Sequence, residues 1–155
     1  MEIRELYSAV DREYWIEQIG KSDWAAGRLL QGWIRTGELK RLCGETTQVF
    51  LLTDGEELVS FCTLAELDDV RETEIGPWIG FAYTFPRYRG QRRMGILLEH
   101  ACAVAERNGA QRVYISTNET GLYEKYGFSF DRMMRDMHGE ATRVYVKEIS
   151  GGGNK

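Results

Sequence analysis

The stretch PRYRGQRRMG, residues 86–95, decides how the rest of the chain is interpreted. The apolar segment before it, residues 77–85, ends at Pro86, which lacks the N–H needed to continue a central strand. After it, residues 91–108 gather apolar side chains on one helical face, and Gly109 is suited to end that helix. We therefore expect residues 86–95 to form a turn between a strand and a long helix.

The segments before this unit indicate helices followed by a hairpin. Apolar residues recur at steps of three and four over residues 10–43, which predicts two helices broken near residues 20–22, and the series of elements begins with them. Residues 47–53 and 57–65 are rich in β-branched and aromatic side chains. They flank the pair Asp-Gly, which readily adopts a tight hairpin turn, so an antiparallel hairpin is expected.

Beyond the long helix, the sequence predicts mostly strands. Residues 112–116 are expected to form a strand and residues 120–126 a short helix, capped by its first residue and ended by Gly127. Two further strands are expected near residues 128–137 and 143–149.

The order of these elements predicts the fold class. A strand, helix, strand unit over residues 77–116 implies a right-handed crossover and at least one parallel strand pair. The other connections favour antiparallel pairing, so we expect an α/β domain of the α+β type with a mixed, mostly antiparallel central sheet flanked by helices. The 155 residues show no repeat or linker and are 43% hydrophobic, which predicts one domain over residues 1–150 and a disordered tail at 151–155.

Composition argues against several classes of protein. The formal charge of −4 disfavours a dedicated nucleic-acid binder and is compatible with a substrate that is itself a cation. No apolar run approaches the roughly 20 residues that span a bilayer, and no basic and apolar leader opens the chain, so no membrane partner and a cytoplasmic location are expected. Cys43, Cys62 and Cys102 are widely spaced and lack metal-ligand spacing with histidine, which predicts reduced core residues and no metal site.

The turn at residues 86–95 has the features of an anion site. Backbone N–H groups at a helix N-terminus carry partial positive charge, and four arginines surround them, at positions 87, 89, 92 and 93. Their guanidinium groups suit a pyrophosphate or a ribose phosphate. Two alternatives remain open at this point: an arginine-rich helix start that only faces water, and a contact with nucleic acid. The P-loop and dinucleotide fingerprints do not occur.

Two quoted motifs resemble a known superfamily. FPRYRGQRRMGILLEHA, residues 85–101, is similar to the acetyl-CoA-binding motif of the GNAT superfamily, whose form is Arg or Gln, two residues, Gly, one residue, then Gly or Ala. GLYEKYGFSF, residues 121–130, resembles its second hallmark, and the resemblance spans about residues 47–149. Aligned on the Leu-Leu pair, the motif glycines fall at Arg92 and Met94 here, so Gly90 and the displaced Gly95 supply the glycine of this turn.

The resemblance implies a set of contacts with acetyl-CoA. The pyrophosphate would rest on the turn, and the pantetheine arm would pair like an extra strand with Ala82, Tyr83 and Thr84. Asn118 resembles an asparagine that contacts the pantetheine. The turn residues implied in binding are Arg89, Gly90, Gln91, Arg92, Arg93, Met94 and Gly95.

The resemblance also implies acetylation of a primary amine by direct attack on the thioester. Tyr123 matches the tyrosine that protonates the leaving thiolate in many family members. Positions of glutamates that act as the base in relatives are Val113 or Trp78 here, so the base is unassigned; Glu66 and Glu119 are the carboxylate candidates, together with the acidic residues that follow Glu66.

The acceptor and the assembly are left open by the sequence. A polyamine, an amino acid derivative, or a lysine or N-terminal amine of a protein would each qualify, and the protein would act as a monomer or a homodimer. A module that binds acyl-CoA or regulates a partner without turnover is the alternative function.

Overall fold

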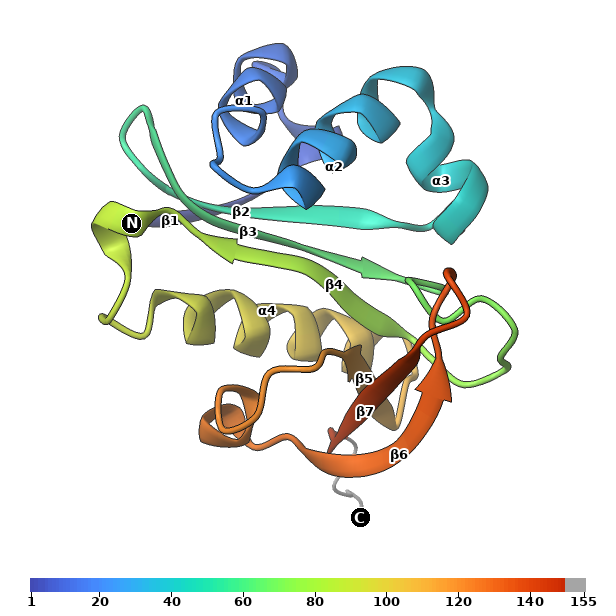
Figure 1. Cartoon of the computed structure of the whole chain (residues 1–155). Coiled ribbons are helices and arrows are strands. Elements are labelled where there is room, and N and C mark those ends of the chain that lie inside the picture. The colour runs from blue at the N-terminus through green and yellow to red at the C-terminus, as the bar shows by residue number, and fades with distance from the viewer. Residues whose placement is uncertain (150–155) are drawn as a thin grey trace.

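The computed structural model describes residues 1–149, which form one seven-stranded mixed sheet between helices (Figure 1). The predicted tail at residues 151–155 lies outside the described residues. The strand order is β1-β2-β3-β4-β5-β7-β6. The strands are β1 (Glu2–Glu5), β2 (Gln48–Asp54), β3 (Glu57–Ala65), β4 (Trp78–Thr84), β5 (Arg112–Ser116), β6 (Ser129–Arg135) and β7 (Ala141–Glu148). The α-helices are α1 (Arg12–Ile19), α2 (Ala25–Thr36), α3 (Glu38–Cys43) and α4 (Arg93–Arg107).

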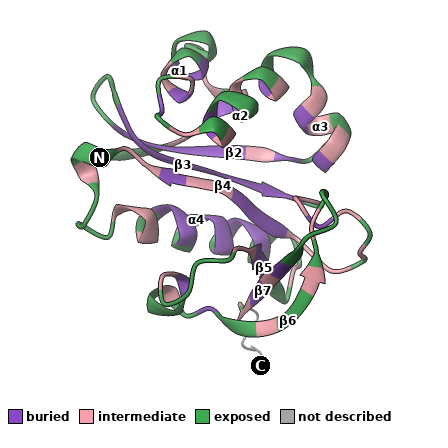
Figure 2. Cartoon of the chain, viewed as in Figure 1, coloured by how far each residue is buried: buried purple, intermediate pink, exposed green. Residues whose placement is uncertain are grey.

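Helices cover both faces of the sheet. Figure 1 shows α1 to α3 on one face and α4 on the other. Residues alternate along β2 so that Phe50 packs with α4 while Leu51 packs with α1 to α3, which buries this strand on both sides (Figure 2). Cys43, Cys62 and Cys102 are buried free thiols in these two cores, as the sequence predicts.

The N-terminal region differs from its prediction in two ways. The chain begins with a strand, β1, which pairs antiparallel with β2, and not with a helix. The break near residues 20–22 is confirmed, but the second predicted helix is two helices, because Gly37 adopts a φ of 83° between α2 and α3. Four residues of mixed character before a 3-10 turn at Leu6–Ser8 give little periodicity to detect, which is why β1 is missed.

The predicted hairpin and the strand–helix–strand unit are both present. β2 and β3 pair antiparallel around Gly55, which has a φ of 62°. The chain runs from β4 through a 3-10 turn at Pro86–Tyr88 into α4 and on to β5, which lies parallel to β4. The later short helix is a 3-10 turn at Tyr123–Tyr126, and its N-cap is Leu122 instead of the predicted Thr120; Gly127 ends it with a φ of 92°.

Strands β4 and β5 meet at one end only. Their single registered pair is Trp78 with Tyr114. On the other side of β4, Phe61 pairs with Tyr83 while Thr63 pairs with Gly80, so β4 carries one residue more than β3 over the same interval. This is a β-bulge, and Phe81 within it has a φ of 48°. Because a bulge bends its strand, β4 turns away from β5 and leaves a gap between them.

No helix within residues 1–149 combines the length and the apolar character needed to cross a membrane. The same residues contain no group of three or more His, Cys, Asp or Glu side chains that could hold a metal ion.

The break at Gly37 gives a test of the helical region. We expect Gly37→Ala to destabilise the protein by about 1 kcal/mol, because alanine pays a steric cost at a positive φ while open space surrounds the added methyl group. Gly32→Ala, within α2 and equally open, should instead stabilise it by about 0.5–1 kcal/mol. Urea unfolding of both variants measures the difference, and equal effects of the two substitutions would contradict the assigned break.

Candidate active site

A cavity of about 930 Å³ occupies the gap between β4 and β5. It extends from the start of α4, past both strands, to α2 and α3 on the opposite face of the sheet, so it passes through the split in the sheet. A volume of this size is within the range of ligand-binding pockets. The candidate residues that line it are Ala82, Tyr83, Thr84, Arg89, Gly90, Arg92, Arg93, Met94, Glu119 and Tyr123.

The turn before α4 is shaped for an anion. Gly90 has a φ of 80° and Arg92, the N-cap residue of α4, has a φ of 56°. No side chain hydrogen-bonds to this helix end in the described structure, so the first backbone N–H groups remain available to a ligand. Gly90, Arg92 and Met94 line the cavity, whereas Gln91 does not.

Three of the four arginines surround this part of the cavity. The Nε atom of Arg89 donates to the carbonyl of Thr84 at 2.8 Å, and its guanidinium lies 5.2 Å from the Tyr83 ring. Arg93 donates to the side chain of Gln91 at 2.9 Å. Arg87 lies outside the lining and pairs with Glu57 at 2.8 Å. The positive charge next to the helix end therefore comes from Arg89, Arg92 and Arg93.

Strand β4 presents backbone groups to the cavity. Ala82, Tyr83 and Thr84 follow the bulge, where the described structure has no registered pairing between β4 and β5. No strand of the described residues pairs with their β5-facing edge, and the one side chain that bonds to the Thr84 carbonyl is that of Arg89. This edge is therefore open to pairing with an extended ligand, which is the arrangement that strand addition requires.

Tyr123 lies on the β5 side of the gap. Its side chain is 8% exposed, and its ring meets Phe128 edge-on at 6.3 Å between ring centres. Burial raises the pKa of Tyr123 above its usual value, and the nearby Glu119 acts in the same direction. The hydroxyl therefore keeps its proton at neutral pH and can act as a donor.

Two predicted residues lie away from the cavity. Asn118 accepts a hydrogen bond from the backbone N–H of Arg143 at 3.3 Å and is not part of the lining. Glu66 packs against Gly44 and accepts from the Thr46 hydroxyl at 3.4 Å, in a separate hollow beside Pro77. Glu119 does line the cavity, but its side chain is exposed.

Asp68 and Asp69 are the carboxylates that the structure brings into the cavity from the loop after β3. Asp68 lies against the backbone of Gly80, where a Cβ atom would overlap its carboxylate oxygen. Burial, reinforced by the charge of Asp69, raises the pKa of Asp68 to about 7. Asp69 has one buried carboxylate oxygen without a hydrogen-bond partner in the described residues. Its pKa is also raised by burial, against the opposing effect of the Ser116 hydroxyl.

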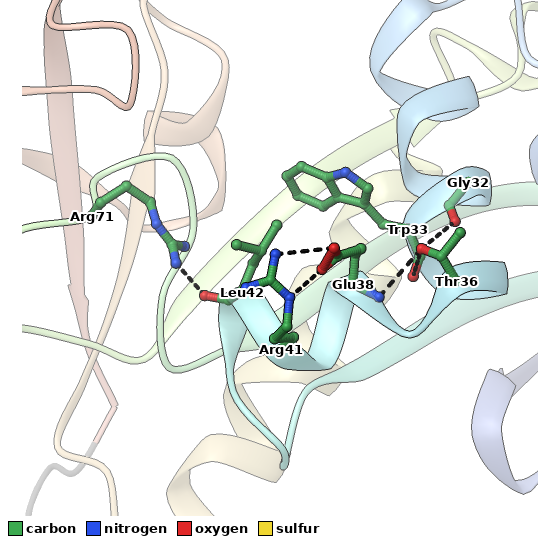
Figure 3. A network of polar contacts seen from close by, with 7 residues as sticks. All are labelled: Gly32, Trp33, Thr36, Glu38, Arg41, Leu42 and Arg71. Carbon is green, nitrogen blue, oxygen red and sulfur yellow. Dashed lines mark hydrogen bonds and ion pairs between the residues drawn. The ribbon is translucent and has the colours of Figure 1, made fainter.

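The loop that carries these carboxylates is fastened to α3. The backbone N–H of Leu67 donates to the carbonyl of Cys43 at 3.1 Å, and Arg71 donates to the carbonyl of Leu42 (Figure 3). Arg71 also donates to the backbone carbonyl of Asp68 at 3.1 Å. These contacts attach the loop to the C-terminal end of α3 and so fix the position of Asp68 beside β4.

The comparisons with known proteins agree with this geometry. The sequence model of the acetyltransferase (GNAT) family matches residues 10–128. This chain belongs to the GNAT family of acetyltransferases. The predicted family, fold class and enzyme class are thereby confirmed. A search of the curated proteins found no significant match.

Solved GNAT structures share the fold. An aminoglycoside 6'-N-acetyltransferase from Enterococcus faecium superposes with a TM-score of 0.72 at 13% identity, over 99% of this chain and 100% of that one. A GNAT acetyltransferase from Elizabethkingia anophelis, with acetyl-CoA bound, gives 0.64 at 14% identity, over 95% and 97% of the two chains. An acetyltransferase from Streptococcus agalactiae gives 0.64 at 21% identity, over 95% and 97%.

This GNAT protein departs from the family motif at its glycines. Arg92 occupies a motif glycine position and nevertheless adopts the left-handed conformation. The displaced Gly95 serves packing, because a Cβ there would lie 2.6 Å from the ring of Tyr126. Tyr126 in turn packs beside the Arg92 guanidinium, 5.2 Å from its ring centre, and so holds this arginine at the cavity edge.

The aromatic lining on the α2 side of the cavity is not predicted by the sequence pattern. Trp24 and Trp33 have their ring centres 6.4 Å and 5.9 Å from that of Phe81, and Trp24 is stacked on Tyr83 at 5.4 Å. Both tryptophans belong to the apolar periodicity of residues 10–43, which does not separate them from core residues of α2 such as Leu30 and Ile34.

Proposed function

We propose that this GNAT protein transfers the acetyl group of acetyl-CoA to a primary amine by direct attack on the thioester. The supporting observation is one continuous cavity that brings a cationic helix N-terminus, an unpaired strand edge, a protonated tyrosine and two half-buried carboxylates together. The named aminoglycoside 6'-N-acetyltransferase has the same fold and acts on an amine. Solved neighbours with bound acetyl-CoA or coenzyme A support the identity of the donor.

The residues at the cationic end fit the donor. Arg89, Arg92 and Arg93, with the N–H groups of the α4 start, would hold the pyrophosphate through charge-assisted hydrogen bonds. The open edge of β4 would pair with the amide groups of the pantetheine arm. Acetyl-CoA would supply the activated thioester, and the β4 N–H groups that face β5 would stabilise charge on its carbonyl oxygen.

The reaction forms one N–C bond and breaks one C–S bond, and this chain has groups for both proton transfers. An amine that binds as a cation would first lose one proton to solvent and attack as the neutral amine. Asp68 would accept the proton that the nitrogen loses on forming the amide, since its raised pKa of about 7 makes it a base matched to neutral pH. Tyr123 would donate its hydroxyl proton to the departing sulfur. The proton on Asp68 then returns to Tyr123 through solvent, so that amide and free thiol leave an unchanged enzyme.

Binding of the donor is the first test. Calorimetric titration with acetyl-CoA should give a micromolar dissociation constant, and the double variant Arg89→Ala, Arg92→Ala should bind about 100-fold more weakly, from two charge-assisted bonds of about 1.5 kcal/mol each. The control is Arg87→Ala, which removes one arginine of the same turn that lies outside the cavity, and it should bind normally. No binding by the unmodified protein would overturn the proposed function.

Tyr123→Phe tests the acid. We expect kcat to fall about 100-fold while acetyl-CoA affinity is retained, because the ring still packs against Phe128 and only the proton donor is lost. Thiol release under saturating amine measures it. Unchanged turnover would remove Tyr123 from the mechanism.

Asp68→Asn tests the base through the pH profile. A carboxyl group with a pKa near 7 is protonated below that pH, so the rate of the unmodified enzyme should fall as the pH drops through about 7. Asp68→Asn should lower kcat about 100-fold and abolish this acidic limb. Glu66→Gln, outside the cavity, should change neither; a loss confined to the Glu66 variant would transfer the role of base to Glu66.

A further inference from the structure

The α2 side of the cavity has an aromatic wall, formed by Trp24, Trp33 and Phe81. All three side chains are partly exposed and line the cavity, and both tryptophans meet Phe81 edge-on. Trp24 is held in place by stacking on Tyr83, with an interplanar angle of 7°. Ala26, Leu29 and Leu42 complete this wall and add apolar surface to it. Asp23, beside Trp24, is the one carboxylate on this side of the described lining, and it accepts a hydrogen bond from the Tyr83 hydroxyl and lies 3.9 Å from Arg89.

The amine-facing group lies directly beside the aromatic wall. Asp68 rests on the backbone of Gly80, and Phe81 is the next residue of the same strand. Asp69, with a buried oxygen that lacks a partner in the described residues, lines the same part of the cavity. The carboxylate of Asp68 and the ring of Phe81 thus lie at two consecutive residues of β4, Gly80 and Phe81.

Apart from Asp23, which is already paired with Arg89 and the Tyr83 hydroxyl, the other charges of this region are positive. Arg71 lines the cavity beside Asp68. Its guanidinium donates to the carbonyl of Leu42 (Figure 3) and also to the backbone carbonyl of Asp68. Arg89 is on the other side of the aromatic wall, 5.2 Å from the Tyr83 ring. A ligand with several ammonium groups would place a second ammonium group near one of these arginines or against the carbon atoms of an indole ring. The arginine would repel it, and the indole ring offers no acceptor to replace the water that it loses.

We propose that the acceptor is a monocationic arylalkylamine, a primary amine joined by a short aliphatic linker to an aromatic ring. The ring packs on Trp24, Trp33 and Phe81, and the amine reaches the carboxylate of Asp68. Aromatic rings pack favourably edge-to-face and offset on one another, and the linker spans the step from Gly80 to Phe81, which are consecutive residues of β4. The inference rests on the proposed acetyl transfer and narrows its substrate.

The first experiment compares amines. Thiol release from acetyl-CoA is measured with 2-phenylethylamine, with n-butylamine as the matched amine without a ring, and with spermidine and kanamycin as polycations. We expect kcat/KM for 2-phenylethylamine to exceed that for each of the others at least tenfold. Absence of turnover with 2-phenylethylamine, or faster turnover of n-butylamine, spermidine or kanamycin, overturns the proposal.

The second experiment tests the wall itself. Trp33→Ala should raise the KM for 2-phenylethylamine about tenfold with kcat and acetyl-CoA affinity retained, and Trp33→Phe should restore most of the loss because a ring remains. Ile96→Ala, an exposed apolar residue on α4 outside the cavity, is the control and should change nothing. An unchanged KM in Trp33→Ala overturns the proposal.

Acetyl transfer and the acceptor class can be tested apart. Absence of acetyl-CoA binding by the unmodified protein overturns the proposed function and the acceptor class together. Normal acetyl-CoA binding with turnover of a polycation and none of 2-phenylethylamine leaves acetyl transfer standing and defeats the acceptor class alone.

Discussion

The separation of β4 from β5 is the constraint on which the rest of the site depends. The strands are joined at Trp78 and Tyr114, whose rings lie 5.5 Å apart in a small core with Val70 and Val144. The Trp78 indole N–H donates to the carbonyl of Ile75 at 2.9 Å, which fixes this closed end. From there the bulge at Phe81 turns β4 away. A closed end that is fully packed and an open end with free backbone groups are what allow one cavity to pass through the sheet.

The same bulge positions the chemistry. It places Gly80 where the loop after β3 crosses β4, and the missing side chain makes room for Asp68. A carboxylate from a loop thereby occupies the space that a side chain on the strand would otherwise take. The loop is hydrogen-bonded to the end of α3 through Leu67 and Arg71. The position of the Asp68 carboxylate is therefore fixed by α3 as well as by its contact with β4.

Much of the fold was predictable because local patterns determine it. The hairpin around Gly55, the strand that ends before Pro86 and the long helix α4 follow from turn chemistry and periodicity, and the order of these elements gives the mixed sheet. The cationic turn was predictable for the same reason, since its arginines are adjacent in sequence. β1 and the division at Gly37 could not be predicted in this way. Four residues are too few to show a periodic pattern, and the sequence does not reveal that a glycine within a periodic run has a positive φ.

The candidate catalytic side of the cavity could be predicted only in part, because its residues meet through long-range contacts. Glu66 and Asp68 are two residues apart and equally acidic in the sequence, yet the structure directs Glu66 to Thr46 and Asp68 to Gly80. Similarly, Trp33 lies close to Phe81 only because α2 packs on β4, and local sequence patterns do not predict which helix packs on which strand.

The two ends of the cavity differ in charge, and this difference follows from where each end lies in the fold. The start of α4 adds the partial positive charge of a helix N-terminus to that of Arg89, Arg92 and Arg93. At the other end Asp68 and Asp69 lie beside Arg71, and burial raises the pKa of both carboxyl groups, that of Asp68 to about 7. The attraction for a polyanion is therefore concentrated at the α4 end. Tyr123 and the open edge of β4 also line the cavity, so in the proposed reaction the phosphates of the donor would be held at the α4 end with the thioester directed toward Tyr123.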